Sequence, residues 1–211
     1  SLRGCCYIRR LANIYGGVTL DWSDYMKQWH ETIMETSYHK DFRIPKLRWS
    51  GFPGVRKTEL SSLERRLEME LPHSYKSFLA FSNGWRNLSW KIDQLWSVDK
   101  IKWFREDNQD WIDAYAEPYL EEPAVTDEEH QIYGEKQSTI VFKIEYLKHC
   151  LQISKEGEGC VFLLNPLIVD DEGEWEAWFF DNKLAGAQRF RSFSDLMQNH
   201  YQEYVSDFLN K

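Results

Sequence analysis

A pair of predicted helices joined by Leu71-Pro72 is the feature that most constrains how this chain can fold. Thr58 can cap the first helix, whose leucines recur at helical spacing. Pro72 ends that helix and begins the next, because proline is tolerated at the first helical position but not in a helix interior. Asn83-Gly84 ends the second helix, because both residues accept the left-handed backbone conformation needed there. The two helices, which are too short to be stable alone, are predicted to pack through Leu63, Leu67, Tyr75 and Phe78.

The segments on either side of this pair differ in character. Before it, Asp21 can cap an amphipathic helix whose apolar residues recur at i, i+3, i+4, i+7 and i+11. After it come short apolar segments, with turns at Glu156–Gly159 and Asp170–Gly173 that predict hairpins. The predicted strands are Leu88–Ile92, Thr139–Lys143, Cys150–Ile153, Cys160–Leu164 and Trp175–Phe180. A final helix is predicted from about Ser194 to Leu209.

This order of elements predicts the fold class and the domain boundary. Helices, then hairpin-linked strands, then a helix are typical of an α+β fold, and not of the βαβ series found in nucleotide-binding folds. The stretch from Arg48 to Lys57 contains two glycines and a proline, which favours a loop. We therefore predict an N-terminal helical extension over residues 1–48, packed on a main domain over residues 49–211.

The charge of the chain is concentrated in one segment. The net charge of the 211 residues is -8, from 34 acidic and 26 basic side chains. Residues 106–130 contain ten acids and no Lys or Arg, so the rest of the chain has a net charge of -8 + 10 = +2. Because phosphates and anionic lipids repel an acidic surface, we predict no direct binding of nucleic acid and no binding to membranes.

The cysteines and the acidic runs do not predict a metal site. The four cysteines are Cys5, Cys6, Cys150 and Cys160, and their spacing matches neither a C-x-x-C pair nor a zinc site. Reduced thiols are the simpler interpretation, which predicts a cytoplasmic protein. The acidic runs lack the spacing of a calcium loop. We predict no metal and no cofactor, and no apolar run reaches transmembrane length.

The sequence also lacks the common catalytic motifs. There is no G-x-S-x-G, P-loop, G-x-G-x-x-G or H-E-x-x-H pattern, and none of the six histidines lies in a nucleophile motif. We therefore predict that the chain is not an enzyme. Residues distant in sequence can still meet in space, so an enzyme or a small-ligand binder stays open as a third hypothesis.

The chain resembles the SMI1/KNR4 family, also called the SUKH superfamily, over about residues 49–206. The resemblance depends first on Glu64, Leu71, Pro72, Tyr75, Phe78, Leu79, Asn83 and Gly84. Later blocks that also match are Leu151–Ser154, Leu164–Pro166, Gly173–Trp178 and Phe190–Phe193. The resemblance implies an α+β fold with a mainly antiparallel sheet flanked by helices, and it brings no shared catalytic residues. Many bacterial members resemble immunity proteins that neutralise a toxin by binding it, whereas fungal relatives are regulatory interaction proteins.

These observations together predict an immunity-type protein that binds and neutralises a cognate secreted or contact-dependent toxin. The excess of acid favours a basic toxin such as a nuclease, because carboxylates would steer its association and aromatic rings would anchor it. The predicted contact residues are Trp85, Glu106, Asp107, Asp110, Trp111, Asp113, Glu117, Glu121 and Glu122. The alternative is a regulatory scaffold that binds an endogenous host protein. The sequence does not predict the oligomeric state.

Overall fold

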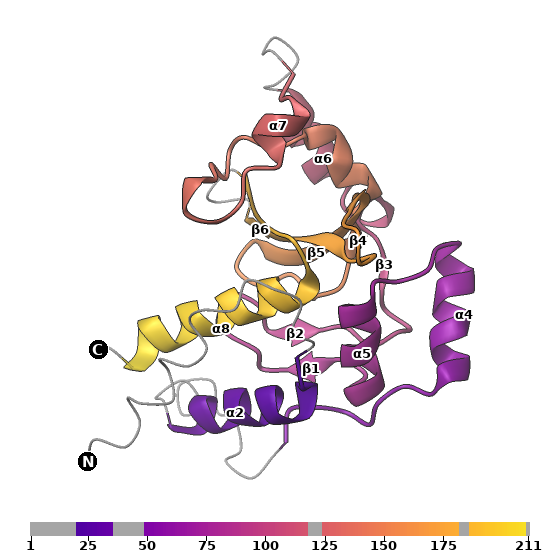
Figure 1. The fold of residues 1–211 in the computed structure, drawn as a ribbon, viewed down its shortest axis with the longest axis vertical. Helices are drawn as coiled ribbons and strands as arrows, with labels where there is room; N and C mark the ends of the chain where they lie inside the picture. The colour runs from indigo at the N-terminus through magenta and orange to yellow at the C-terminus, as the bar shows by residue number, and fades with distance from the viewer. Residues whose placement is uncertain (1–19, 36–48, 118–123, 182–185, 210–211) are drawn as a thin grey trace.

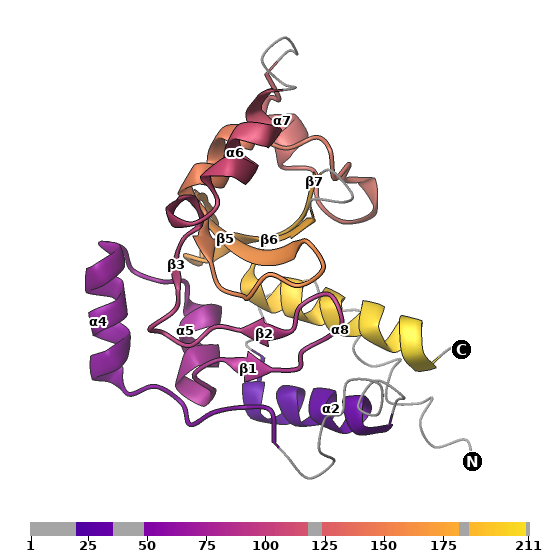
Figure 2. The same cartoon turned by 180° about the vertical axis from the view of Figure 1, so that it is seen from behind.

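A five-stranded antiparallel sheet forms the centre of the protein, and helices flank it on both sides (Figure 1 and Figure 2). The computed structural model describes residues 20–35, 49–117, 124–181 and 186–209. The strand order of the sheet is β3-β4-β5-β6-β7, and β1 and β2 form a separate antiparallel pair. The predicted α+β class, with a mainly antiparallel sheet flanked by helices, is confirmed.

The bounds of the elements are as follows. The α-helices are α2 (Trp22–Glu35), α4 (Lys57–Leu67), α5 (His73–Phe81), α6 (Gln109–Ala116), α7 (Asp127–His130) and α8 (Phe193–Leu209). The strands are β1 (Trp85–Arg86), β2 (Gln94–Leu95), β3 (Lys102–Trp103), β4 (Leu151–Gln152), β5 (Cys160–Val169), β6 (Trp175–Asp181) and β7 (Gly186–Phe190). The 3-10 helices are η1 (Phe104–Glu106), η3 (Gly134–Lys136) and η4 (Ile144–His149).

The two faces of the sheet bury two separate hydrophobic cores. Successive side chains of a strand point to opposite faces. On β5, Phe162 and Leu164 therefore belong to the core shared with α2, α5 and α8, whereas Val161 and Leu163 belong to the core beneath α6 and η4. In Figure 1, α2, α5 and α8 lie on one side of the sheet and α6 and α7 on the other. Every described residue of β6 is buried, as expected for a central strand covered on both faces.

The larger core joins segments that are far apart in sequence. The ring of Phe193, at the start of α8, lies 4.9 Å from the ring of Tyr75 and 5.4 Å from that of Phe78. Trp22 of α2 packs 5.3 Å from both Phe78 and Phe193. Leu63 is buried in the same core, and with Leu67, Tyr75 and Phe78 also buried there, the predicted packing of α4 on α5 is confirmed. The helix of the predicted N-terminal extension thus contributes to the core of the main domain.

The starts of these helices agree only in part with the sequence prediction. Asp21 caps α2 as expected, since its Oδ1 accepts hydrogen bonds from the backbone N–H groups of Ser23 and Asp24. Thr58, in contrast, is already helical, so its predicted role as a cap was wrong. The cap residue of α4 is Arg56. The Glu59 carboxylate accepts a hydrogen bond of 2.8 Å from the backbone N–H of Arg56. Glu59 decides the start of the helix because it reaches back over the first turn.

The cap of α5 comes from the hairpin between β5 and β6. Pro72 precedes the helix and offers no side-chain cap. The Glu174 carboxylate replaces it, because Oε1 accepts from the Ser74 backbone N–H at 2.7 Å and Oε2 accepts from the Ser74 hydroxyl. A carboxylate at this position also interacts favourably with the helix dipole. Glu174 therefore fixes the second helix of the Leu-Pro pair to the sheet.

Replacing Glu174 with alanine should lower the free energy of unfolding by about 1–2 kcal/mol, which is the usual cost of a lost helix cap. Chemical unfolding of the variant and of the wild type would measure this difference. Glu172→Ala is the matched control, because Glu172 is an exposed acid of the same turn. Equal losses in the two variants would contradict the capping role of Glu174.

Two of the predicted strands are not strands. Residues Leu88–Ile92 form the turn between β1 and β2, in which the Ser89 N–H donates to the Ile92 carbonyl. Residues Thr139–Lys143 instead lie beside the edge of β7, where the Thr139 carbonyl accepts from the Ala187 N–H. Their apolar residues resemble a strand because Phe142 is buried in the second core. The other three predicted strands correspond to β4, β5 and β6, and the final helix corresponds to α8.

Candidate protein-binding surface

An exposed row of carboxylates occupies the outer face of η1 and α6. Asp110, Asp113 and Glu117 follow one another at i, i+3 and i+7, so they lie along one side of the helix. Ile112 is on the opposite side and is buried in the second core. Glu106 is exposed at the end of η1, shortly before α6 begins. We call Glu106, Asp110, Asp113 and Glu117 the acidic face.

The acidic face has little internal neutralisation. Within the described part of the chain, Asp110 and Glu117 have no ion pair or hydrogen-bonding partner. Asp113 accepts a 2.8 Å hydrogen bond from the neutral Gln109 amide. Glu106 accepts a 2.9 Å hydrogen bond from the backbone N–H of Trp103. The four carboxylates therefore retain a negative charge that is not compensated by a neighbouring cation.

Asp107 differs from the other predicted acids. Its carboxylate forms an ion pair with Lys102 on β3. Lys102 lies before residues 106–130, so the charge balance of that segment does not predict the pair between Lys102 and Asp107. Asp107 is exposed, but its charge is already largely neutralised by Lys102.

The predicted aromatic anchor Trp111 and its neighbour Tyr115 mainly hold α6 on the sheet. The ring of Trp111 lies 5.9 Å from that of Phe104 and 6.0 Å from that of Phe180. The ring of Tyr115 lies 4.9 Å from that of Phe180, and its hydroxyl donates to the Asp181 carbonyl. Both side chains are half-buried. They can add apolar contact at the edge of the acidic face, but most of their packing is internal.

Trp85 is not a surface anchor. Its side chain is 0% exposed and belongs to the larger core, and its ring lies 4.9 Å from that of the exposed Trp49. Trp85 starts β1, four residues after α5 ends at Phe81 with Ser82 as its C-cap residue. It therefore has to be removed from the predicted contact set. Glu121 and Glu122, which are also in that set, lie outside the described residues.

A buried polar network lies between the sheet and the segment that follows α7. This network was not predicted from the sequence. Its centre is Glu176 on β6, which is 1% exposed. Oε2 of Glu176 accepts hydrogen bonds from His130 Nε2 at 3.1 Å, Asn165 Nδ2 at 2.9 Å and Trp178 Nε1 at 2.6 Å. Oε1 accepts from the Tyr133 hydroxyl at 2.9 Å. The Arg189 guanidinium lies 4.0 Å away and donates to backbone carbonyls, including that of His130.

The hydrogen bonds of this network define its charge state. Burial alone would raise the pKa of Glu176, but the hydrogen bonds from His130, Asn165 and Trp178 lower this pKa below its usual value. His130 Nδ1 accepts from the Lys143 backbone N–H, so the tautomer that fits has its hydrogen on Nε2. Because these groups are fully buried and satisfied by one another, the network indicates a structural role rather than a reactive one.

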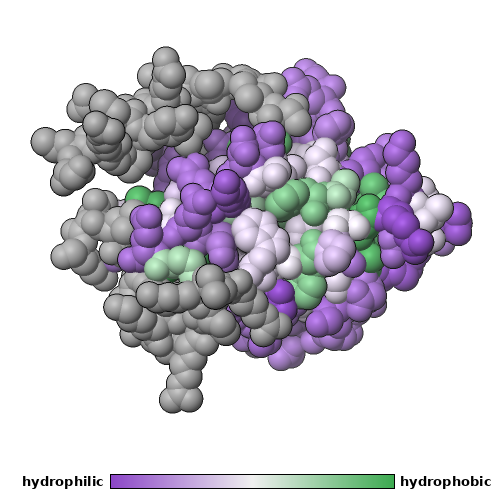
Figure 3. All heavy atoms as spheres, turned by 90° about the horizontal axis from the view of Figure 1, so that it is seen from below, coloured by the Kyte–Doolittle hydropathy of each residue, from purple (hydrophilic) through white to green (hydrophobic). Residues whose placement is uncertain are grey.

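Other surface features are less concentrated. In the described residues, no group of three or more His, Cys, Asp or Glu side chains is placed to hold a metal ion. Nor does any helix in those residues have the length and apolar character needed to cross a membrane. Figure 3 shows one face, on which a short band of hydrophobic residues is bounded by hydrophilic ones. The exposed large hydrophobic residues are Trp49, Met69, Trp90, Ile132, Ile140, Leu167 and Val169.

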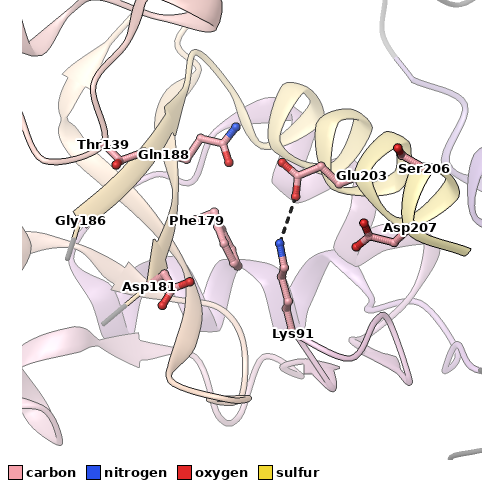
Figure 4. Close-up of a pocket in the computed structure, with 9 residues that line it drawn as sticks. All are labelled: Lys91, Thr139, Phe179, Asp181, Gly186, Gln188, Glu203, Ser206 and Asp207. Carbon is pink, nitrogen blue, oxygen red and sulfur yellow. Dashed lines mark hydrogen bonds and ion pairs between the residues drawn. The ribbon is translucent and has the colours of Figure 1, made fainter. Parts of the chain in front are cut away.

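A pocket of about 270 Å³ lies between α8, the ends of β6 and β7, and the β1–β2 turn (Figure 4). Glu203, Ser206 and Asp207 line it from α8, and Lys91 lines it from the turn. The sheet and its edge contribute Thr139, Phe179, Asp181, Gly186 and Gln188. The pocket is distant in sequence from the acidic face and was not predicted.

The structure therefore defines an α+β protein with an acidic face along α6, a buried polar network around Glu176 and a polar pocket beside α8. Residues 54–199 match the SMI1 / KNR4 family (SUKH-1), and the chain belongs to this family. The resemblance in the Leu-Pro helix pair and the later blocks is thereby confirmed. The family includes immunity-type proteins and is generally non-catalytic. A comparison with curated proteins finds no match.

Proposed function

We propose that this chain is an immunity-type protein of the cytoplasm, which neutralises a cognate toxin by binding it and has no catalytic activity of its own. Membership of the SMI1/KNR4 family supports the class. The observation that carries the proposal for the partner is the exposed row of Asp110, Asp113 and Glu117 along α6, which forms no ion pair with any cation among the described residues. Such a surface suits a basic protein, for example a nuclease toxin.

Electrostatics gives this surface a specific role. A nuclease needs positive charge to bind phosphates. An acidic face would attract the same positive surface over a distance of about 8–10 Å at physiological salt and raise the association rate. Because α6 is fixed to the sheet through Ile112 and Trp111, the carboxylates keep their spacing before binding. The neutralising effect would then come from covering the basic surface of the toxin.

The first test is whether a partner exists. The product of the reading frame adjacent to this gene should co-purify with the full chain and lose its toxic activity in the complex. Absence of binding to any toxin-like neighbour would count against the immunity assignment. Inhibition of the toxin by stoichiometric amounts of this chain, measured at equilibrium, would support it and would distinguish binding from turnover.

The second test concerns the surface. The triple variant D110N/D113N/E117Q should slow association with the partner by about tenfold at low salt and flatten its dependence on salt, while the dissociation rate changes little. Stopped-flow or surface-based kinetics at several salt concentrations would measure both rates. A matched control, E135Q/E156Q/E172Q, removes the same charge from exposed positions elsewhere. If both variants associate at the same rate, the acidic face is not the contact, and the existence of a partner is decided by the co-purification test alone.

A further inference from the structure

We propose that the pocket beside α8 receives an arginine side chain of the protein partner. This inference rests on the proposed protein-binding function, because the arginine would come from the protein partner. The pocket itself is separate from the acidic face. Figure 4 shows Lys91 and Glu203 directed toward each other across the pocket, with Asp207 beside them on α8 and Phe179 on the sheet side. A water occupies about 30 Å³ in the liquid, so a pocket of about 270 Å³ has room for a whole side chain.

The charged groups of the pocket favour a cation. Glu203 and Asp207 on α8 contribute two formal negative charges and Lys91 one positive charge, so these three side chains have a net charge of -1. Lys91 Nζ lies 3.5 Å from a carboxylate oxygen of Glu203. Asp207 has no ion pair or hydrogen bond in the described part of the chain. An incoming cation would therefore find a carboxylate on α8 that Lys91 does not already neutralise.

The sheet side of the pocket offers an aromatic ring. Phe179 is nearly buried, and Lys91 Nζ lies 5.3 Å from the centre of its ring. The chain thus already places one of its own cations between an aromatic face and a carboxylate, which is the environment that an arginine prefers. A guanidinium suits this site better than an ammonium, because it is flat, is weakly hydrated and can bond a carboxylate with two N–H groups.

The rim of the pocket points to a protein as the source of the arginine. Trp90 is 41% exposed, and Lys91 Nζ lies 5.4 Å from the centre of its ring. On the other side, the exposed Ile140 follows Thr139, which lines the pocket. Exposed Trp beside a site for Arg is the combination enriched at the centres of protein interfaces. A free amino acid would leave both apolar side chains uncovered.

The test uses the full chain and N-acetyl-arginine amide as the probe. In a titration followed by two-dimensional NMR of the backbone amides, the probe should give saturable shifts at Lys91, Gly186, Gln188 and Asp207, with a dissociation constant in the roughly millimolar range. N-acetyl-citrulline amide has the same shape without the charge and should bind at least fivefold more weakly. Equal binding of the two probes, or an absence of saturable shifts at the pocket, would overturn the proposal.

A variant links these shifts to the pocket. E203Q/D207N should weaken binding of the arginine probe at least fivefold, whereas E128Q/E172Q, which removes the same charge from exposed positions outside the pocket and the acidic face, should leave it unchanged. Equal weakening by both variants would mean that net charge, and not the pocket, binds the probe. A negative titration together with intact toxin binding rejects only the pocket. A positive titration without any toxin partner rejects only the immunity assignment.

Discussion

Replacing Glu176 with alanine should lower the free energy of unfolding by about 3–5 kcal/mol, the usual cost of breaking a buried ion pair from one side. The variant loses the acceptor for His130, Asn165 and Trp178. It also leaves the guanidinium of Arg189, which is 1% exposed, without a negative charge nearby. Equilibrium unfolding in urea would measure the loss.

A double-mutant cycle separates the charge pair from the packing. Replacing both Glu176 and Arg189 with methionine removes the two buried charges together, so the double variant should be more stable than the sum of the single losses indicates. E176Q keeps the shape of the side chain and should cost less than E176A. A loss below 1 kcal/mol for E176A, or strict additivity in the cycle, would show that the network does not hold the segment after α7 on the sheet.

The parts of the fold that were predicted correctly depend on neighbours in the sequence. The helix pair around Leu71-Pro72, the cap at Asp21 and the turn at Asp170–Gly173 are all determined by local backbone preferences. The predicted strand Cys160–Leu164 is a continuous apolar segment, and it forms the part of β5 that is buried on both faces. Local signals of this kind survive in the folded chain because the tertiary structure agrees with them.

The errors arise where a distant residue decides the outcome. Residues Thr139–Lys143 have the composition of a strand, but what they contribute at the edge of β7 is the Thr139 carbonyl. The preceding Gln137 covers the same edge with its side chain, which bonds both backbone groups of Arg189. The sequence alone allows Trp85 to lie on the surface or in the core, because a single residue outside a periodic segment shows no hydrophobic periodicity that would assign it to one side. The folded structure decides this, because Trp85 is fully buried in the larger core.

The candidate sites divide in the same way. The acidic face could be predicted because its residues are close together in sequence: Asp110 and Asp113 lie on α6, Glu117 is its C-cap residue, and Glu106 precedes the helix. The Glu176 network and the pocket could not, because their members come from separate segments of the chain. The sequence did contain a partial signal: Asn165, Glu174, Glu176 and Phe193 all belong to blocks that resemble the family. The structure explains these residues as the cap of α5, the buried network and the packing of α8.

Acidification should destabilise the protein well above the pH at which carboxylates titrate, because of His200. This side chain is buried on α8, where Nε2 lies 2.8 Å from the Ser89 hydroxyl and the ring packs 5.0 Å from Phe162. Burial, and to a lesser extent the positive charge of Lys91, lowers the pKa of His200 from 6.5 to about 3. The folded protein therefore keeps this histidine neutral under conditions in which the unfolded chain is protonated.

The sign of the effect follows from this difference. As the pH falls below 6.5, only the unfolded state gains the proton, so the free energy of unfolding should fall by about 1.4 kcal/mol per pH unit until the folded state is also protonated near pH 3. Between pH 6.5 and 4.5 the expected loss is about 2–3 kcal/mol. Urea unfolding at several pH values would measure this slope. His200→Gln should flatten it, whereas His73→Gln, at an exposed position on α5, should leave it unchanged. If the slope of the His200 variant equals that of the wild type, a group other than His200 is responsible. Asp and Glu ordinarily titrate below this pH window, so the comparison tests the histidine.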